Sequence, residues 1–217
     1  MTTPSSDTET TPDHAAVLAQ TRRTRPVRLG NRGTHDIAAI HAIIDEAPVC
    51  HIGFMDGADA TAPVVIPTIP WRIGDELLIH GASSSRMIRR LQSGAESCIT
   101  VSLIDGWVLA RSAFHHSVNY RSVVLFGRPR LVGDEAEKRA ALDALVEKIQ
   151  PGRAARVRAP NAQELKATSV LAFPIAEASA KIRSGPPSDD PEDMGHPVWA
   201  GVVPLALVAG EPVEDRA

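Results

Sequence analysis

One stretch decides the fold of this chain: FHHSVNYRSVVLFG, residues 114–127. Its second half, Ser122–Phe126, has the apolar and β-branched content of a buried strand. Its first half carries two histidines, an asparagine, a tyrosine and an arginine. Burying such groups unpaired would cost about 1–3 kcal/mol each. We therefore expect these polar side chains to face a ligand, a partner chain or water.

Apolar runs and turn signals on both sides of this stretch predict a mainly β fold. Gly74-Asp75 and Asp105-Gly106 are hairpin signals, and the strands do not alternate with helices as they do in dinucleotide-binding folds. Six or more antiparallel strands joined by tight turns indicate a closed β-barrel with helices packed outside it. The expected strands cover Val49–Met55, Pro63–Arg72, Glu76–His80, Ser97–Leu103, Trp107–Ala113, Asn119–Val132 and Thr168–Ile182, with a last apolar segment over Val198–Val208.

Helically spaced apolar residues predict the helices that flank these strands. Three of the helices follow residues that commonly occupy the N-cap position, where a side-chain oxygen accepts a hydrogen bond from the first turn. The expected helices cover His35–Glu46 after the N-cap Thr34, a segment after Ser83-Ser84-Ser85 to about Gln92, Glu135–Ile149 after the N-cap Asp134, and the shorter segments His14–Arg23 and Asn161–Lys166.

Composition divides the chain into three parts. We expect residues 1–24 to be an arm that is disordered or partly helical, because Met1–Asp13 is rich in Thr, Ser and Pro and nearly free of apolar residues. Residues 25–208 form the β domain, and residues 209–217 form a loose tail. A basic segment is either solvated or lies over an anionic ligand or an acidic face of a partner; it consists of Arg22, Arg23, Arg25, Arg28 and Arg32.

The net charge of −3 argues against a general nucleic-acid binder. No apolar run approaches the roughly 20 residues that a membrane-spanning helix needs. The N-terminus is acidic and polar, unlike a secretory signal, which has a basic and then an apolar region. These features predict a soluble cytoplasmic protein.

Neither the cysteines nor the neighbouring histidines have the spacing of metal ligands. Cys50 and Cys98 lie in apolar runs without a CxxC pattern, and we expect two buried thiols in a reducing compartment. His115 and His116 are adjacent, so in a strand their side chains would point to opposite faces. No carboxylate lies near them in sequence, and no metal site is expected.

The segment His80-Gly81-Ala82-Ser83-Ser84-Ser85-Arg86 leaves an expected strand and enters an expected helix. Helix N-termini attract anions through unpaired N–H groups and the helix dipole. Serine hydroxyls and a guanidinium add charge-assisted hydrogen bonds, and Gly81 lets the backbone approach a ligand closely. A phosphate group is the natural occupant; the alternative is a plain serine cap beside a solvated arginine.

The start of the strand in the quoted stretch supplies a second polar cluster, which could hold the same phosphate from another side. Alternation puts Asn119 and Arg121 on one face and Tyr120 and Ser122 on the other. All four can touch one ligand only if a bulge intervenes. Without a bulge, one pair is left for a dimer contact.

Prolines interrupt the expected strand Pro63-Val64-Val65-Ile66-Pro67-Thr68. Proline within a sheet implies an edge, a strand start or a bulge, because it has no N–H to donate. Such a strand leaves backbone N–H and C=O groups free to bond a flat heterocycle. A plain edge strand is the alternative.

These segments, in this order, resemble the FMN-binding split-barrel family, and within it the pyridoxamine 5′-phosphate oxidase-like flavin-nucleotide-binding branch, which includes the nitroimidazole-resistance reductases. The likeness covers roughly Arg25–Leu205. It implies a six-stranded antiparallel split β-barrel that works as a homodimer, with two FMN sites at the interface that are each lined by both chains. The matching pieces are Val65-Ile66-Pro67-Thr68 with Trp71-Arg72-Ile73-Gly74-Asp75, His80–Met87, His116–Val123 and Pro197–Pro204.

The resemblance also implies roles for positions of this chain. The backbone of Ile66–Thr68 would bond the isoalloxazine edge, and Ser85 and Arg86 would hold the phosphate. Arg121-Ser122 would support the phosphate or the ribityl chain, and Trp199 would come from the partner subunit. The expected cofactor-binding residues are Val65, Ile66, Pro67, Thr68, His80, Gly81, Ser84, Ser85, Arg86, Asn119, Arg121, Ser122 and Trp199.

One departure bears on the activity that the resemblance implies. The pyridoxamine phosphate oxidases proper carry a lysine just after the phosphate-binding arginine, and this chain has Met87 there. Vitamin B6 oxidation is therefore not expected. We expect instead an FMN-dependent oxidoreductase that takes electrons from a reduced pyridine nucleotide, or another donor, and reduces a small acceptor such as a nitroaromatic. His80 and Tyr120 are the candidate general acids.

Two other functions stay open. A non-catalytic flavin-nucleotide carrier or sensor would use the same site without turnover. The family also has members that bind haem or the deazaflavin F420, and His80, His115 and His116 are the residues that would favour a haem-binding protein.

Overall fold

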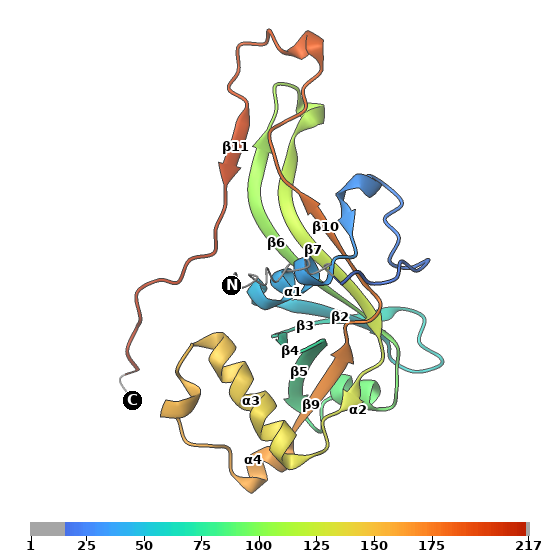
Figure 1. The fold of residues 1–217 in the computed structure, drawn as a ribbon, viewed down its shortest axis with the longest axis vertical. Helices are drawn as coiled ribbons and strands as arrows, with labels where there is room; N and C mark the ends of the chain where they lie inside the picture. Colours follow the sequence, from blue (N-terminus) through green and yellow to red (C-terminus); the bar gives the residue numbers. More distant parts are fainter. Residues whose placement is uncertain (1–15, 216–217) are drawn as a thin grey trace, which may run out of the picture.

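Two antiparallel sheets, flanked by helices, form the protein in a computed structural model that describes residues 16–215 (Figure 1). The larger sheet has the strand order β1-β10-β7-β6-β2-β3, and β11 pairs with β6 beside this path. Its longest strands are β6 and β7, and β7 contains most of the stretch quoted first. The strands of this sheet are β1 (Gly33–Thr34), β2 (Cys50–Met55), β3 (Pro63–Thr68), β6 (Ser97–Leu109), β7 (Ser117–Gly127), β10 (Ala178–Arg183) and β11 (Gly201–Pro204).

The smaller sheet has the order β4-β5-β9-β8. It consists of β4 (Trp71–Ile73), β5 (Glu76–Ala82), β8 (Arg130–Leu131) and β9 (Thr168–Pro174). Antiparallel pairing and flanking helices confirm the mainly β expectation. The closed barrel is wrong, because the strands divide into two separate sheets, of seven and four strands among the described residues, and the count of six is not recovered.

Three expected strands each break into two, and the two halves lie in different sheets. The break between β3 and β4 falls at Ile69-Pro70, and the break between β7 and β8 falls at Arg128-Pro129. Proline cannot donate to a ladder, which explains why pairing stops there. The third break, between β9 and β10, is a turn in which the Ile175 N–H donates to the Asp75 carbonyl at 2.8 Å. At each of these three breaks the chain passes from one sheet to the other, so the strands do not close into a single barrel.

The hairpin expected at Asp105-Gly106 is wrong, because β6 continues through it as one strand. Asp105 is an extra residue: the register with β7 shifts between Ile104 and Gly106, which is a β-bulge. A Cβ on Gly106 would lie 2.9 Å from the carbonyl oxygen of Val203 in β11. Gly106 therefore permits the close approach of β11 instead of forming a turn.

The spacing of apolar residues correctly predicts four of the five expected helices, although one N-cap differs. Asp36, not Thr34, caps the first helix, and its carboxylate accepts hydrogen bonds from the N–H groups of Ala38 and Ala39. The helix expected over His14–Arg23 is wrong where the structure describes it, because residues 16–23 contain no helix. The predictions for Met1–Asp13 lie outside the described residues. The helices are α1 (Ile37–Glu46), α2 (Arg86–Gln92), α3 (Glu135–Ile149) and α4 (Ala162–Ala167), with short 3-10 turns η1 (Gly30–Arg32), η2 (Ala113–His115), η3 (Ala154–Arg156) and η4 (Pro191–Asp193).

Two apolar cores lie on the two faces of the smaller sheet. Leu77 and Ile79 of β5 belong to the main core, which also takes in α1, α2 and the inner face of the larger sheet. Leu78 belongs to a second core against α3, together with Trp71. Burial of this apolar surface, at roughly 25 cal/mol per Å², drives the packing of the sheets and helices. Successive side chains of β5 point alternately to these two cores. The position of each polar residue in β5 therefore decides which face of the sheet its side chain lies on.

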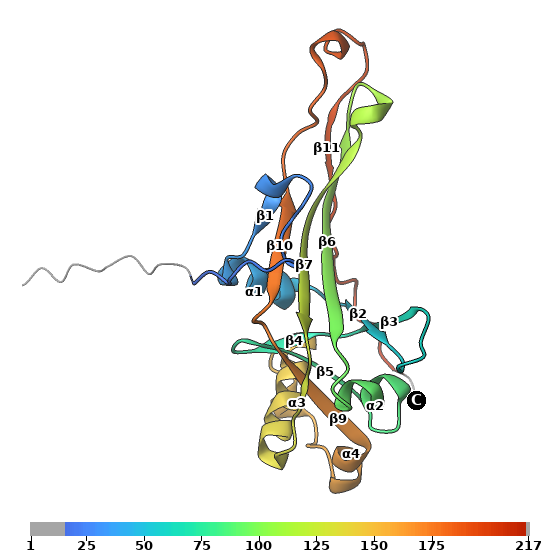
Figure 2. The same ribbon diagram turned by 90° about the vertical axis from the view of Figure 1, so that its right-hand side faces the viewer.

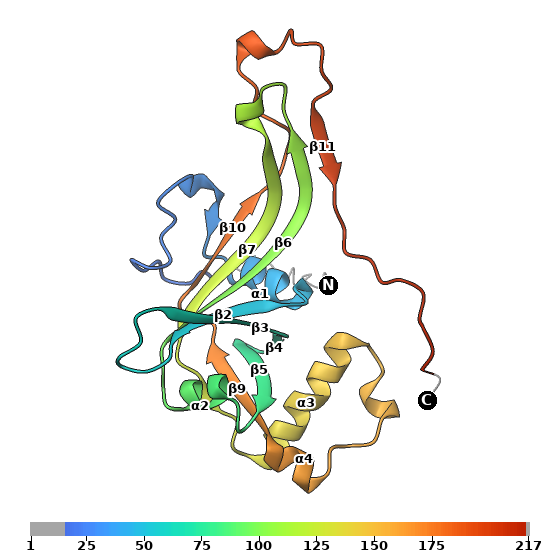
Figure 3. The ribbon, with the colours of Figure 1, turned by 180° about the vertical axis from the view of Figure 1, so that it is seen from behind.

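The strands β6 and β7 project beyond the body of the molecule as a long hairpin (Figures 2 and 3). The turn η2 lies at its tip, and the chain passes through η4 there before it returns as β11 alongside β6. Within residues 16–215, none of the helices is both long and apolar enough to cross a bilayer.

Candidate functional site

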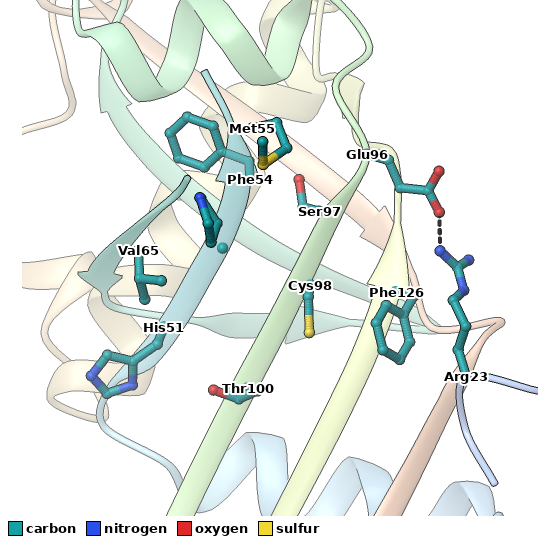
Figure 4. Close-up of a pocket in the computed structure, with 12 residues that line it drawn as sticks. Arg23, His51, Phe54, Met55, Val65, Glu96, Ser97, Cys98, Thr100 and Phe126 are labelled. Atoms are coloured by element: carbon teal, nitrogen blue, oxygen red, sulfur yellow. Dashed lines mark hydrogen bonds and ion pairs between the residues drawn. The ribbon is translucent and has the colours of Figure 1, made fainter. Parts of the chain in front are cut away.

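The outward face of the larger sheet carries an apolar cavity of about 460 Å³ near the junction of β2, β3 and β6 (Figure 4). Alternation explains its lining: Cys50, Ile52 and Phe54 of β2 are buried, whereas His51 and Met55 are exposed. The cavity is lined by Arg23, His51, Gly53, Phe54, Met55, Pro63, Val65, Glu96, Ser97, Cys98, Thr100 and Phe126. Sequence reasoning missed most of these residues, although the alternation of β2 and β6 could have revealed them.

The helix α2 lies against the same end of β2. The Arg90 Nε donates to the carbonyl oxygen of Met55, a cavity residue, at 2.7 Å. Arg86 lies one turn earlier, at the start of α2, and its Nε lies 3.4 Å from the carboxylate of Asp56. The Arg86 side chain is 63% exposed, so its guanidinium remains available to a further anion. Arg86 is thus held near the rim of the cavity by the residue that follows Met55.

The three serines before α2 differ in whether their hydroxyls already have hydrogen-bond partners. The Ser85 Oγ accepts a hydrogen bond from the Ile88 N–H at 3.2 Å and so caps the helix. The Ser83 Oγ lies 2.9 Å from the Ser169 Oγ, within its own chain. Ser84 is exposed and makes no side-chain hydrogen bond among the described residues. Of the three hydroxyls, Ser84 is therefore the one that is free to bond a ligand.

Gly81 allows the close approach of a neighbouring side chain, not of a ligand as expected. A Cβ at this position would lie 2.9 Å from Cγ1 of Ile88, so the glycine lets α2 pack on β5. Met87, at the position where the resemblance carries a lysine, is buried in the main core. Neither residue presents a polar group to the cavity.

The strand β3 lies at the edge of the larger sheet. It pairs with β2 alone, with Val65 opposite Gly53, Ile66 opposite Ile52 and Pro67 opposite His51. The other side of β3 is not paired with a strand, so backbone groups of Val65–Thr68 can bond a ligand. Val65, 58% exposed, also lines the cavity.

Arg121 is not brought to Arg86 within one chain. Its guanidinium bonds the carboxylates of Glu46, at the end of α1, and Asp105, in the bulge of β6. Arg121 pairs with Leu103, which is six residues along β6 from the cavity residue Ser97, or about 20 Å of strand. Hydrogen bonds from Arg121 hold the pKa of Glu46 below its ordinary value.

The neighbours of Arg121 also have partners in their own chain. Asn119 is buried; its Nδ2 donates to the Gly185 carbonyl at 3.1 Å, and its Oδ1 accepts from Arg183. The Ser122 Oγ donates to the Lys181 carbonyl at 3.3 Å. The strand β7 itself has no bulge, so the expected alternation of these residues is preserved.

His80 lies on the opposite side of the smaller sheet from the apolar cavity of Figure 4. It follows Ile79, which faces the main core, and lies on the same face of β5 as Leu78, toward α3. It lines a separate cavity of about 510 Å³ against that helix. Burial lowers the pKa of the His80 imidazole, so the ring is neutral at neutral pH.

His115 lies in η2, at the tip of the β6–β7 hairpin, and His116 follows it; this tip is far from α2 (Figure 1). Trp199 shortly precedes β11, whose first residue, Gly201, pairs with Leu109 at the end of β6. Trp199 is 63% exposed. The ligand atoms of His115, Asp190 and Asp193 lie within 4.8 Å of one another, so the fold brings to His115 the carboxylates that are absent from its sequence neighbourhood. His116 Nδ1 is bonded to the Ser112 carbonyl oxygen at 3.0 Å.

The basic arm contributes Arg23 to the cavity of Figure 4. The Arg23 guanidinium pairs with Glu96 and Glu177 of the same chain and lies 4.7 Å from the centre of the Phe126 ring. These contacts fix part of the arm over an acidic patch of its own domain. The Cys98 thiol lines the same cavity, and burial raises its pKa. Both Cys50 and Cys98 are free thiols, but only Cys50 is buried as expected, and Cys98 is partly exposed.

Comparisons with solved structures find relatives that match nearly the whole chain. The flavocytochrome Anf3 from Azotobacter vinelandii is 41% identical, with 90% of both chains covered and a TM-score of 0.83. The FAD and heme binding protein from Mycobacterium smegmatis is 38% identical, with 85% of this chain and 89% of that chain covered and a TM-score of 0.80.

A more distant relative is described as a 5-nitroimidazole antibiotic resistance protein from Bacteroides thetaiotaomicron. It is 25% identical over 69% of this chain and 86% of its own, with a TM-score of 0.58. No curated protein matches the chain in sequence. The family model described as pyridoxamine 5′-phosphate oxidase matches residues 36–182. The chain therefore belongs to the pyridoxamine 5′-phosphate oxidase-like family.

Proposed function

We propose that this protein is a redox protein of the flavocytochrome kind, which binds a flavin nucleotide and a haem. The observation that carries the proposal is the 41% identity with flavocytochrome Anf3 over 90% of both chains. The relative from Mycobacterium smegmatis, described as binding FAD and haem, supports the same pair of cofactors. Haem thereby moves from an open alternative to part of the proposed function.

The cavity of Figure 4 and the neighbouring start of α2 fit a flavin. An isoalloxazine ring is flat and mostly apolar, which suits the walls formed by Met55, Val65 and Phe126. The unpaired edge of β3 offers backbone groups to the polar edge of that ring. Arg86 offers a guanidinium that is largely exposed beside its ion pair with Asp56, and Ser84 offers a free hydroxyl, to a phosphate. The chain thus supplies all three kinds of contact in one region.

The flavin is proposed to be FAD in preference to FMN. The Mycobacterium smegmatis relative, at 38% identity, is described as binding FAD, and this supports the larger nucleotide. FMN remains the alternative that the resemblance in sequence implies. The shared chemistry is the isoalloxazine and its first phosphate, and chromatography of the released flavin distinguishes the two nucleotides.

The site is proposed to be completed by a second copy of the chain. Outward-facing residues of the larger sheet include exposed apolar side chains, among them Met55, Val65 and Ile104. An exposed apolar face of this kind on a sheet is a common homodimer surface. A dimer would also explain how Trp199 could approach a flavin, since within one chain it lies beside the start of β11, where Gly201 pairs with Leu109 at the opposite end of β6 from the cavity residue Ser97.

A bound flavin supplies the electron transfer, and the chain supplies position and exclusion of water. We propose a small-molecule acceptor; the 25% identity with the nitroimidazole-resistance relative supports a nitroaromatic only weakly. His80 faces α3, so it does not serve as an acid for a flavin on the outward face. A flavin carrier or sensor without turnover is the alternative, and it predicts binding without reduction by any donor.

Absorbance spectra of the purified protein, before and after addition of FAD, FMN and haemin, test the proposal. We expect a flavin spectrum and a Soret band, FAD in the released flavin, and a dimer in light scattering. A reduced pyridine nucleotide and a panel of acceptors in stopped flow then distinguish an enzyme from a carrier. If calorimetry detects binding of neither flavin nucleotide, the proposal fails.

A further inference from the structure

The imidazole of His80 lacks the partners that a buried polar side chain normally has. Its Nδ1 is buried without a hydrogen-bond partner, and no hydrogen bond to the ring is found among the described residues. Its contact with another ring is with Trp71, whose centroid is 5.8 Å away and whose own Nε1 is also buried without a partner. An unpaired buried polar group costs about 1–3 kcal/mol, so this ring needs a physical explanation.

The cavity beside His80 has the size and the walls of a cofactor site. Its volume of about 510 Å³ lies within the range of roughly 300–1,000 Å³ that is usual for small-molecule sites. Leu142, Leu145 and Val146 of α3 form one apolar wall, and Val157 and Pro160 of the segment after η3 form another. A flat apolar molecule could lie between these walls with one edge against the histidine.

The charges around this cavity are few and largely paired. The carboxylate of Glu164 accepts hydrogen bonds from the Arg158 guanidinium at 2.8 and 2.5 Å, which lowers the pKa of Glu164 to about 2. Asp143 lies at the rim, exposed to water. His80 itself is neutral, because burial lowers its pKa. A neutral imidazole keeps the lone pair with which it binds metals.

The other histidines of interest are less suited to hold iron. His115 is bonded to the Asp190 carboxylate at 3.0 Å, and His116 to a backbone carbonyl, at the exposed hairpin tip. The Nε2 of His41 is also buried without a hydrogen-bond partner, but it lies 3.5 Å from the Asp75 carboxylate, and His41 lines neither of the two cavities described above. His51 is exposed and lines the cavity of Figure 4, where the flavin is proposed. His80 combines a cavity, apolar walls and an unpartnered ring.

We propose that the cavity between β5, α3 and residues 154–160 binds the haem, with His80 as the ligand of the iron. The proposal rests on the haem part of the proposed function and assigns that haem to a place in this chain. Histidine is a common axial ligand of haem iron. In this assignment the haem lies on the α3 side of the smaller sheet. The flavin lies in the cavity that His51 lines, on the outward face of the larger sheet, so the two cofactors occupy separate cavities.

The test is haemin titration of the full chain, followed by the Soret band, with His80→Ala, His116→Ala and His51→Ala compared with wild type. Mutation of residues that only hydrogen-bond a metal ligand typically weakens metal binding about 10–100-fold. His80→Ala removes the ligand itself, so it should weaken haem binding by at least as much. His116→Ala and His51→Ala should bind haem as wild type does. Added imidazole should restore the Soret band in His80→Ala, which a merely structural role of His80 would not predict.

A second variant keeps His80 and fills its cavity. Val157 is 42% exposed at the wall, so Val157→Trp should fold and exclude haem while leaving flavin binding unchanged. If His80→Ala and Val157→Trp bind haem like wild type, the assignment is wrong although the protein is still a haem protein. If wild type binds no haem, both the assignment and the haem part of the proposed function fail, and flavin binding is judged separately from its own spectrum.

Discussion

Arg121 binds Asp105 with two hydrogen bonds, from Nη2 to Oδ1 at 2.7 Å and from Nε to Oδ2 at 3.0 Å. Asp105 is the extra residue of the β6 bulge, and Arg121 lies on the neighbouring strand β7. The same guanidinium reaches Glu46 at the end of α1. One side chain therefore ties the bulge, the strand and the helix together, which gives Arg121 a role in its own fold.

Replacing Arg121 with Met should destabilise the fold. The change removes both ion pairs and leaves two carboxylates facing each other with no cation between them. The guanidinium is 30% exposed, so part of the interaction is screened by water, and we expect a loss of about 1–2 kcal/mol in the free energy of unfolding. Urea unfolding of Arg121→Met against Arg89→Met, which removes an exposed arginine without an ion pair in the described chain, provides the measurement. Equal stability of the two variants would contradict this role.

The same interaction should depend on pH. Arg121 lowers the pKa of Glu46 in the folded state from its ordinary 4.5. The stabilisation is therefore fully present above pH 4.5 and is lost as the pH falls through the lower folded-state pKa, where Glu46 becomes protonated. The difference in unfolding free energy between wild type and Arg121→Met should shrink over that acidic range. Arg89→Met should show no such change, and a difference independent of pH would exclude this linkage.

Much of the secondary structure could be predicted from local sequence signals. Asp134 and Asn161 begin helices as expected, since capping depends on the residue and its next turn. The sheet arrangement could not be predicted in the same way. Asp105-Gly106 reads as a hairpin locally, yet β11, about 100 residues further along the chain, packs against Gly106 and makes it a bulge.

The candidate site was predictable to a similar extent. Arg86 and the β3 edge carry local signals; Val65 of β3 lines the cavity, and Arg86 contacts Asp56, the residue after the cavity residue Met55. Arg121 carries the same kind of signal, but Glu46 and Asp105 occupy it, and these partners come from distant parts of the sequence. His80 looked like part of the phosphate segment, and only the pairing of β5 with β4 and β9 shows that it faces α3.

Gly106→Ala should release β11 from β6. The new methyl group would lie 2.9 Å from the Val203 carbonyl, a backbone atom that cannot move without breaking the pairing. Overpacking of this kind costs about 1–3 kcal/mol. Gly127→Ala is the matched control, because no atom lies within 4 Å of a Cβ at that position of β7. Hydrogen exchange should accelerate at the amides of residues 201–203 in Gly106→Ala and remain slow in the control; unchanged exchange in both would argue against the close contact.

Arg86→Ala should weaken flavin binding without weakening the fold. Arg86 is 63% exposed, and its contact with Asp56 is a long 3.4 Å. A charge-assisted hydrogen bond to a phosphate is worth about 1.5–3 kcal/mol, which corresponds to a loss of roughly 10–150-fold in affinity. Arg89→Ala removes an arginine from the same helix and should bind flavin as wild type does. Calorimetric titration with FAD compares them, and equal affinities would remove Arg86 from the site.

Cys98 should report occupation of the cavity of Figure 4. It lines that cavity, and burial raises the pKa of its thiol, so alkylation at neutral pH should be slower than for a free cysteine. Cys50, the internal control, is fully buried with a pKa raised to about 12 and should not react in the folded protein.

A ligand that fills the cavity would cover Cys98, so added flavin should slow its alkylation by iodoacetamide, measured by mass spectrometry of the intact protein. Haemin should leave the rate unchanged, because the proposed haem cavity at His80 lies on the other side of the smaller sheet. Protection by haemin and none by flavin would reverse the assignment of the two cavities.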